Sequence, residues 1–414
     1  MKTNVTTAFI AVLLGISPVK AQNYLSNPKH HHQMEAFQIN ISQEKINELN
    51  SRISKTRWIS ETAAPVWGDP ILDYSTIKAL TDYWGADFEW KKHEAHINNF
   101  PQFRAFVKDI NIHFVYQKGN GSGHIPILFL HGWASNFNEF LKTAELIGKE
   151  NPGFDVIIPS LPGFAFSDVP ESMDSATAAE YIHHLMTGIL GYEDYYVHGS
   201  DYGAFVGEKL ALKYPESVKG LHLSDIPFYH LYSPGENLSQ SEKDYIEKIN
   251  DWSMRDGTYG MIQGTKPQTL SIGLNDSPVA LAAWILQLYF DLGDKELSIF
   301  ERFSKDDLLV NISLYWFTES IYPSIRLYSE DLSGYDGKPV EKVTVPVAFN
   351  LHRFDISGFV PKAFAERFYA NIVSYTEFKD GGHFSGLSHP EQLKNNLIDF
   401  IEQIEENKTG IINI

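Results

Sequence analysis

The chain has no cysteine among its 414 residues. This absence excludes a disulfide framework, a thiol nucleophile and a thiolate metal site. Basic residues are scarce as well, because 34 lysines and arginines stand against 52 aspartates and glutamates, for a formal net charge of −18. Such an acidic excess argues against binding to nucleic acid or to an anionic membrane surface. We therefore expect no nucleic-acid partner.

The sequence also lacks an apolar run of the roughly 20 residues that a membrane span needs. Residues 8–16 form a shorter apolar run, which follows Lys2 and precedes small residues at Val19 and Ala21. This pattern predicts a secretory signal peptide over residues 1–21, cleaved after Ala21, with an uncleaved anchor as the alternative. We expect the mature protein to be soluble, without a stable membrane anchor, and secreted or periplasmic.

The apolar content of the chain is large, with 43% hydrophobic and 14% aromatic residues, and suffices for a buried core. Residues 22–102 are expected to form an N-terminal arm. Its first part is polar and contains three histidines at 30–32, which indicate a linker rather than a metal site because no further ligand pattern accompanies them. From about residue 39 the apolar spacing is helical and tryptophans recur, which favours an arm packed on the main domain.

Short apolar strands alternate with helical segments over residues 103–226. This alternation predicts an α/β fold with a mostly parallel central sheet covered on both faces. Residues 227–337 contain helical, aromatic-rich segments and are expected to form a helical cap inserted in the core. Strands return in residues 338–414, before a C-terminal helix. The expected strands are 110–116, 125–130, 155–159, 195–198, 218–223, 345–349 and 374–378.

The segment from Val197 to Gly203 carries the strongest functional signal. A nucleophile elbow, the sharp turn between a strand and a helix, needs small residues two before and two after the nucleophile. Gly199 and Gly203 meet this need only if Asp201 is the nucleophile, because an elbow centred on Ser200 puts bulky residues at the crowded positions. The spacing predicts an α/β-hydrolase fold with aspartate in place of serine. Because a carboxylate attacks carbon that bears a leaving group, we expect epoxide or carbon–halogen hydrolysis.

An ester formed on an aspartate must be hydrolysed, which requires a histidine base and an acid that orients it. In this fold the order along the chain is nucleophile, acid, histidine. His383 follows the last predicted strand and is the expected base, and Asp355 follows the preceding strand and is the expected acid. Asp380 and Glu366 are alternatives for the acid, but one adjoins the histidine turn and the other lies in the following helix.

Backbone amides and tyrosine hydroxyls are the other groups that this chemistry requires. Amides must stabilise charge on the carbonyl oxygen of the nucleophile during ester hydrolysis. The fold takes one from the residue after the nucleophile, Tyr202, and one from the loop after the third strand, at Trp133. Ring opening also needs a donor to the developing alkoxide, a role that suits two tyrosines of the cap. Composition alone does not choose among the 21 tyrosines.

Motifs along the arm, the core and the cap together resemble one known family. They are Tyr83-Trp84, Phe88–Lys92, Asn98–Phe103, Ile112–Phe114, His131-Gly132-Trp133, Pro159–Ser167, Val218–Leu223, Gln263–Thr269, Asn275–Pro278, Tyr315-Trp316 and Ser324–Tyr328. On these motifs the chain resembles the microsomal-type epoxide hydrolases, including the insect juvenile-hormone and fungal relatives, from about Phe37 to the C-terminal helix. The sequence departs from the family pattern at Ala134, where proline is usual, and at Tyr202, where tryptophan is usual.

The resemblance implies a role for individual residues. It places the nucleophile at Asp201, the base at His383 and, with a one-residue shift in the following loop, the acid at Asp355. It also selects Tyr259 and Tyr328 as the two cap tyrosines. The family needs no metal and no organic cofactor, and its partners are a small-molecule epoxide and water.

The expected activity is the conversion of an epoxide to a vicinal diol through a covalent ester of the enzyme. A haloalkane-type dehalogenase is the nearest enzymatic alternative, although Tyr202 cannot supply the indole that commonly holds the halide. A secreted, non-catalytic ligand-binding relative is the alternative from another class. The sequence leaves open the substrate, its stereochemistry and the oligomeric state, a homo-oligomer included.

Overall fold

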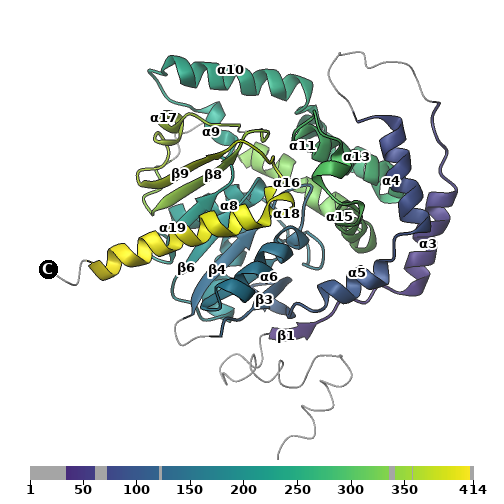
Figure 1. The fold of residues 1–414 in the computed structure, drawn as a ribbon, viewed down its shortest axis with the longest axis horizontal. Helices are drawn as coiled ribbons and strands as arrows, with labels where there is room; N and C mark the ends of the chain where they lie inside the picture. The colour runs from purple at the N-terminus through teal and green to yellow at the C-terminus, as the bar shows by residue number, and fades with distance from the viewer. Residues whose placement is uncertain (1–33, 61–71, 121–123, 335–340, 357, 411–414) are drawn as a thin grey trace, which may run out of the picture.

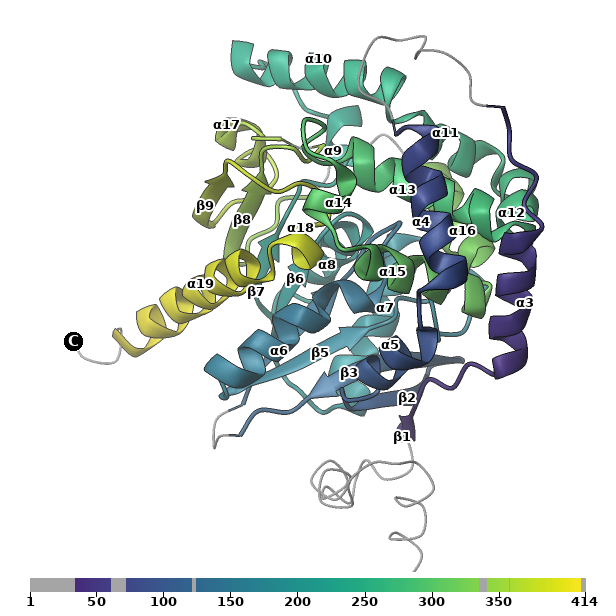
Figure 2. The same ribbon diagram turned by 45° about the vertical axis from the view of Figure 1, so that its right-hand side comes forward.

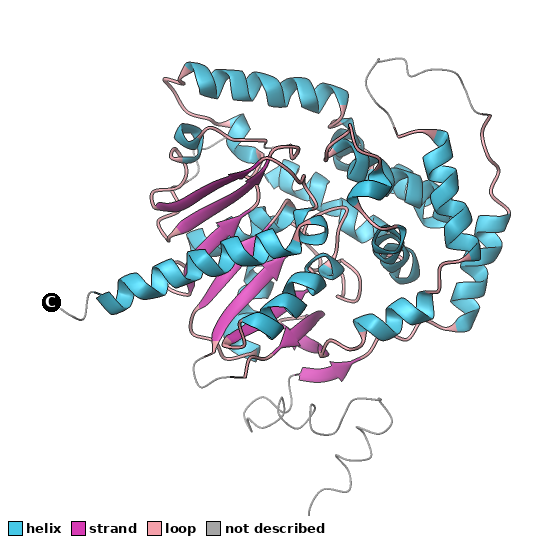
Figure 3. Ribbon diagram, viewed as in Figure 1, coloured by secondary structure: helices cyan, strands magenta, loops and turns pink. Residues whose placement is uncertain are grey.

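A mixed sheet of nine strands crosses the molecule and is drawn in magenta in Figure 3. The computed structural model describes residues 34–60, 72–120, 124–334, 341–356 and 358–410. The strand order is β1-β2-β3-β5-β4-β6-β7-β8-β9, antiparallel from β1 to β5 and parallel from β5 to β9. The strands are β1 (Met34–Phe37), β2 (Gln102–Val107), β3 (Ile110–Gln117), β4 (Ile125–Leu130), β5 (Phe154–Pro159), β6 (Tyr195–Gly199), β7 (Val218–Leu223), β8 (Val347–His352) and β9 (Ile372–Phe378).

The central strands are buried on both faces, as parallel strands covered by helices should be. All residues of β5, and all but the first of β4, are buried. Two helices, α6 and α19, contact each other in front of the sheet in Figure 1, and α8 lies behind it in contact with α7. These helices are α6 (Leu141–Glu150), α7 (Ser175–His184), α8 (Tyr202–Lys213) and α19 (Pro390–Gly410). The predicted α/β-hydrolase fold with a mostly parallel sheet is therefore confirmed.

Helices alone fill the described chain between β7 and β8, where the sequence predicts a cap (Figure 2). They are α9 (Tyr229–Tyr232), α10 (Gln240–Arg255), α11 (Thr258–Thr265), α12 (Pro267–Asp276), α13 (Pro278–Asp291), α14 (Ile299–Arg302), α15 (Lys305–Thr318) and α16 (Ile321–Gly334). Hydrogen bonds tie this layer to the loop after β4. The Tyr315 hydroxyl donates to the Ser135 carbonyl at 2.6 Å, and the Trp133 indole donates to the Ser324 hydroxyl at 3.1 Å. The cap is thus held over the carboxyl end of a central strand.

The N-terminal arm packs against the cap through three helices, α3, α4 and α5, which contact α13 or α15 and lie along one side of the molecule in Figure 2. Their bounds are α3 (Gln43–Ser54), α4 (Tyr74–Ala86) and α5 (Trp90–Ile97). Ser42 caps the first of them by accepting a hydrogen bond from the Lys45 amide. Trp84 and Trp90 are buried, and the Trp84 indole donates to Ser313 at 3.1 Å. Two arm tryptophans therefore act as packing residues.

The arm also contains an element that the sequence did not predict. Strand β1 pairs with β2 and adds an antiparallel edge to the sheet, so the arm is not helical throughout. The predicted signal peptide (1–21), the histidines at 30–32 and Trp67 lie outside the described residues, and the predicted domain limits stay predictions. No single helix among the described residues is long and apolar enough to span a membrane, and α12 with α13 passes that test only as a pair bent by 118°.

The remaining helices are short and connect the larger elements. They are η1 (Phe137–Phe140), the π-helical η2 (Leu185–Ile189), α17 (Lys362–Ala365) and α18 (Ser385–Ser388).

Candidate active site

The turn from β6 to α8 presents Asp201 in a strained conformation. Its backbone has φ 50° and ψ −125°, a region that residues with a side chain rarely adopt and that often marks a functional turn. A Cβ on Gly199 would lie 2.4 Å from the Gly203 carbonyl oxygen, and one on Gly203 would lie 1.9 Å from the Leu130 carbonyl oxygen. The two glycines are required by this crowding, and the elbow is centred on Asp201 rather than on Ser200.

The Asp201 carboxylate lies between a backbone amide and an imidazole. Its Oδ1 accepts a hydrogen bond from the Trp133 amide at 2.7 Å. Its Oδ2 lies 3.4 Å from His383 Nε2. No hydrogen bond links the Tyr202 amide to this carboxylate within the part of the chain that the structure describes, and the Tyr202 hydroxyl donates instead to the Met173 carbonyl. The structure thus brings the Trp133 amide onto the carboxylate and leaves the Tyr202 amide beside it, at the start of α8.

His383 bridges Asp201 and Asp355. Its Nδ1 is 2.7 Å from Asp355 Oδ1, and the same carboxylate oxygen accepts the Ile356 amide at 2.6 Å. Burial disfavours an imidazolium here, but the charge of Asp355 and hydrogen bonds to Asp201 and Asp355 outweigh burial and hold the pKa of His383 well above its usual value. The two carboxylates therefore favour the imidazolium form of His383.

The alternative acids do not reach this histidine. The Asp380 side chain is 60% exposed and faces His389 at 3.8 Å. The Glu366 side chain is 57% exposed and faces Lys362 at 4.0 Å. Of the three carboxylates considered from the sequence, only Asp355 contacts His383.

Tyr259 in α11 and Tyr328 in α16 are cap residues that lie near Asp201. A hydrogen bond joins their side chains, and their rings are 6.2 Å apart. The Trp133 ring lies beside both, stacked with Tyr259 at 6.3 Å and edge-on to Tyr328 at 5.9 Å. Burial and the nearby charge of Asp201 raise the pKa of both hydroxyls, so they keep their protons at every ordinary pH. Both side chains are therefore neutral hydroxyl donors that lie close enough to Asp201 to feel its charge.

Two buried carboxyl groups near the site were not found from the sequence. Asp225 follows β7, and its Oδ2 accepts the Asp201 amide at 2.6 Å. Glu139 lies in η1, where burial raises the pKa of its carboxyl to about 7 despite hydrogen bonds from Ser135 and the backbone of Gly386. The position of Asp225 at the carboxyl end of a parallel strand is a signal that could have found it. The sequence around Glu139 carries no comparable signal.

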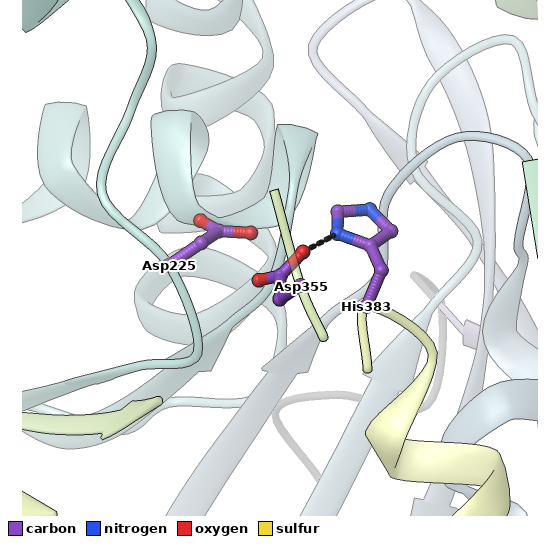
Figure 4. A group of neighbouring side chains, drawn as sticks. All are labelled: Asp225, Asp355 and His383. Atoms are coloured by element: carbon purple, nitrogen blue, oxygen red, sulfur yellow. Dashed lines mark hydrogen bonds and ion pairs between the residues drawn. The ribbon is translucent and has the colours of Figure 1, made fainter. Parts of the chain in front are cut away.

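Asp225, Asp355 and His383 are close enough to suggest a cation site, since one ligand atom of each lies within 4.8 Å of the others (Figure 4). Their hydrogen bonds favour another use. His383 Nδ1 is bonded to Asp355, as the dashed line in Figure 4 marks, and Asp225 Oδ2 is bonded to the Asp201 amide. A metal ion bound through His383 Nδ1 would displace the first of these bonds. The arrangement therefore suits proton sharing among acids and an imidazole.

Comparison with protein families gives two matches along the chain. Residues 34–140 match the family described as "Epoxide hydrolase N terminus", and residues 125–280 match "alpha/beta hydrolase fold". The chain is 32% identical over 408 residues to epoxide hydrolase 1 of Oryctolagus cuniculus, with 89% of each chain covered.

Solved structures give the same assignment. Juvenile hormone epoxide hydrolase of the silkworm Bombyx mori superposes with a TM-score of 0.79 at 26% identity, covering 93% of this chain and 98% of that one. The epoxide hydrolase of Aspergillus niger superposes with a TM-score of 0.78 at 29% identity, covering 89% and 96%. Similarity over nearly the full length of both chains includes the arm and the cap as well as the core.

Proposed function

The chain belongs to the microsomal-type epoxide hydrolase family, and on that premise we propose that it hydrolyses an epoxide to a vicinal diol through an ester formed at Asp201. One observation carries the proposal. The Asp201 carboxylate lies on a strained elbow, with one oxygen on the Trp133 amide and the other beside His383, and its charge acts on Tyr259 and Tyr328 of the cap. A carboxylate nucleophile, a base and two neutral donors are the groups that epoxide opening followed by ester hydrolysis requires.

In the first step Asp201 attacks a ring carbon of the epoxide. Oδ1 is engaged by the Trp133 amide, so Oδ2 is the oxygen that forms the new bond to carbon. The ring carbon–oxygen bond breaks, its electron pair moves to the oxygen, Tyr259 and Tyr328 stabilise the alkoxide by donating hydrogen bonds, and a proton from solvent completes the new hydroxyl group. Because the tyrosines are neutral, they assist without repelling the departing charge.

In the second step His383 removes a proton from water, and the resulting hydroxide attacks the ester carbonyl of Asp201. Esterification removes the negative charge of Asp201, one of the causes that raise the pKa of His383, so the imidazole releases its proton more easily once the ester exists. Asp355 stabilises the imidazolium that forms. The bond between the carbonyl carbon and the substrate oxygen then breaks, and the departing alkoxide takes the proton from His383, which releases the diol and restores the Asp201 carboxylate. The Trp133 amide holds the carbonyl oxygen as it becomes negative, and the Tyr202 amide is proposed as the second donor.

The test of this function is diol formation by the purified protein across aromatic, terminal alkyl and fatty-acid epoxides. A parallel panel of chloroalkanes, with chloride release as the readout, tests the dehalogenase alternative. The proposal predicts diol formation without chloride release. Chloride release with no diol from any epoxide would replace it by dehalogenation, and tight binding of an epoxide without turnover would favour the non-catalytic alternative.

Tyr328→Phe should slow formation of the ester more than its hydrolysis. The hydroxyl stabilises the alkoxide, which exists only in the first step, and a hydrogen bond to a charged group is worth about 10- to 100-fold in rate. Single-turnover kinetics that resolve the two steps would measure this difference. Tyr322→Phe on the same helix is the matched control, because the Tyr322 hydroxyl bonds to Gln268 instead. An unchanged rate of ester formation in Tyr328→Phe would remove that tyrosine from its assigned role.

A further inference from the structure

Asp225 is a buried carboxyl group with one oxygen left free. Asp225 is the second residue after β7, and only 6% of the residue is exposed. Oδ2 accepts the Asp201 amide at 2.6 Å, whereas Oδ1 has no hydrogen-bond partner among the described residues. A buried carboxylate oxygen without a partner is costly unless the group carries a proton or shares one.

The surroundings of Asp225 contain more negative than positive charge. In Figure 4 its carboxyl group points towards that of Asp355, with the His383 ring beyond, and ligand atoms of the three lie within 4.8 Å of one another. Asp201 and the Tyr369 hydroxyl are the other titratable groups that face it. Burial, followed by the charge of Asp355, raises the pKa of Asp225 to about 8. Burial and the neighbouring charge of Asp355 therefore both favour the neutral form of Asp225.

We propose that Asp225 is a second acid of the active site, a positioning residue that anchors the nucleophile's amide and orients His383 whenever Asp355 carries no charge. The inference rests on the proposed function, because it assigns Asp225 a part in the ester-hydrolysis step. The reason is electrostatic. When the charge of Asp355 is removed, one of the two main causes that keep Asp225 protonated is gone and burial alone remains, so the pKa of Asp225 falls and its carboxylate can attract the imidazolium as Asp355 did.

A double-mutant cycle on the rate of ester hydrolysis tests this exchange of roles. Asp225→Asn keeps an oxygen that can accept the Asp201 amide. It should slow ester hydrolysis by no more than about 3-fold, an effect as small as that of most surface substitutions. Asp355→Asn should slow it by about 10- to 100-fold, less than the loss of a general base, because Asp225 takes over. The rate of ester hydrolysis in the double variant should be lower, by about 10-fold or more, than the product of the two single effects predicts. Equal effects of Asp225→Asn in both backgrounds would overturn the proposal.

Asp331→Asn is the matched control for this cycle. Asp331 is also a largely buried carboxyl with one unpartnered oxygen among the described residues, and its other oxygen accepts the Ser175 amide at 2.8 Å. It ties α16 to α7, away from His383. Its replacement should change ester hydrolysis by the same factor in the wild type and in Asp355→Asn. If Asp331→Asn and Asp355→Asn were as non-additive as Asp225→Asn and Asp355→Asn, any buried carboxyl would give this result. That outcome would also overturn the proposal.

Thermal unfolding tests the proton on Asp225 without any substrate. Below pH 4 the folded and the unfolded chain both hold this proton, so it does not affect stability. Between pH 4 and pH 8 the unfolded chain releases the proton while the folded chain keeps it, so the free energy of unfolding falls as pH rises and stops falling once pH passes the folded pKa of about 8. Asp225→Asn should therefore melt at a higher temperature than the wild type at pH 8, with the difference disappearing at pH 4.

The two measurements separate this inference from the function on which it rests. If the wild type forms no diol, the proposed function fails, and the melting comparison still reports on Asp225. If the wild type forms diols but Asp225→Asn melts like the wild type at both pH values, Asp225 holds no trapped proton and only the second-acid proposal is overturned. In the Asp355→Asn background the gain at pH 8 should shrink, because the charge that helps to raise the pKa of Asp225 is then absent.

Discussion

His383→Gln should make the protein accumulate an alkyl-enzyme ester when it meets an epoxide. The glutamine cannot accept a proton from water, and loss of a general base slows a step by about 10²- to 10⁴-fold. Ester formation needs only Asp201 and the tyrosine donors, so it continues. Intact-mass spectrometry after mixing should show one substrate mass added to nearly every molecule, and digestion should place it on the peptide that contains residue 201.

His389→Gln is the matched control for this experiment. His389 lies six residues further on, is 28% exposed and bonds to Ser388 at 2.8 Å, so its replacement should leave no adduct. Circular dichroism shows whether His383→Gln is folded, since the change leaves Asp355 buried without its partner. A folded His383→Gln protein that forms neither adduct nor diol would contradict the two-step scheme.

Asp201→Asn should abolish turnover, by about 10⁴-fold or more, as removal of a nucleophile does in enzymes with covalent intermediates. The amide is a poor nucleophile, but it keeps the shape of aspartate and an oxygen for the Trp133 amide, so the fold should persist. Diol formation under substrate saturation measures the loss. Introduced into His383→Gln, the same change should remove the adduct, because no ester can then form.

Ser200→Ala tests the register of the elbow in the same assay. Ser200 stands where a serine hydrolase with a shifted elbow would carry its nucleophile, yet it is buried beside β4 and its amide bonds to Leu130. Turnover by Ser200→Ala should stay close to that of the wild type. Loss of turnover in Ser200→Ala together with normal turnover in Asp201→Asn would reverse the assignment.

The parts of the site that local spacing determines were predictable from the sequence. The glycines at 199 and 203 identify Asp201 because backbone crowding at the turn acts only on near neighbours in the chain. The order of strands and loops identifies His383 and Asp355, since successive parallel strands end at one edge of the sheet. Tyr259 and Tyr328 were different, because their place near Asp201 depends on how the cap folds back, and only a family resemblance selected them.

Other features could not be predicted because they arise from tertiary packing. Strand β1 is four residues long and exists through its pairing with β2, so its own sequence carries little signal. Asp225 could have been singled out by its place at the end of a strand, but nothing in the residues next to it in the sequence, or next to Glu139, indicates that burial raises the pKa of these carboxyls. A single carboxylate becomes informative only when the groups around it are known.

The central claim is that the oxygen delivered to the substrate comes from a protein carboxylate and not from water. A single turnover in water enriched in heavy oxygen, with enzyme in excess over epoxide, tests this directly. The account predicts that the label appears in the carboxylate of the peptide containing residue 201, while the first diol released carries none. Label in that first diol, with an unlabelled peptide, would show that water attacks the epoxide itself and would contradict the account.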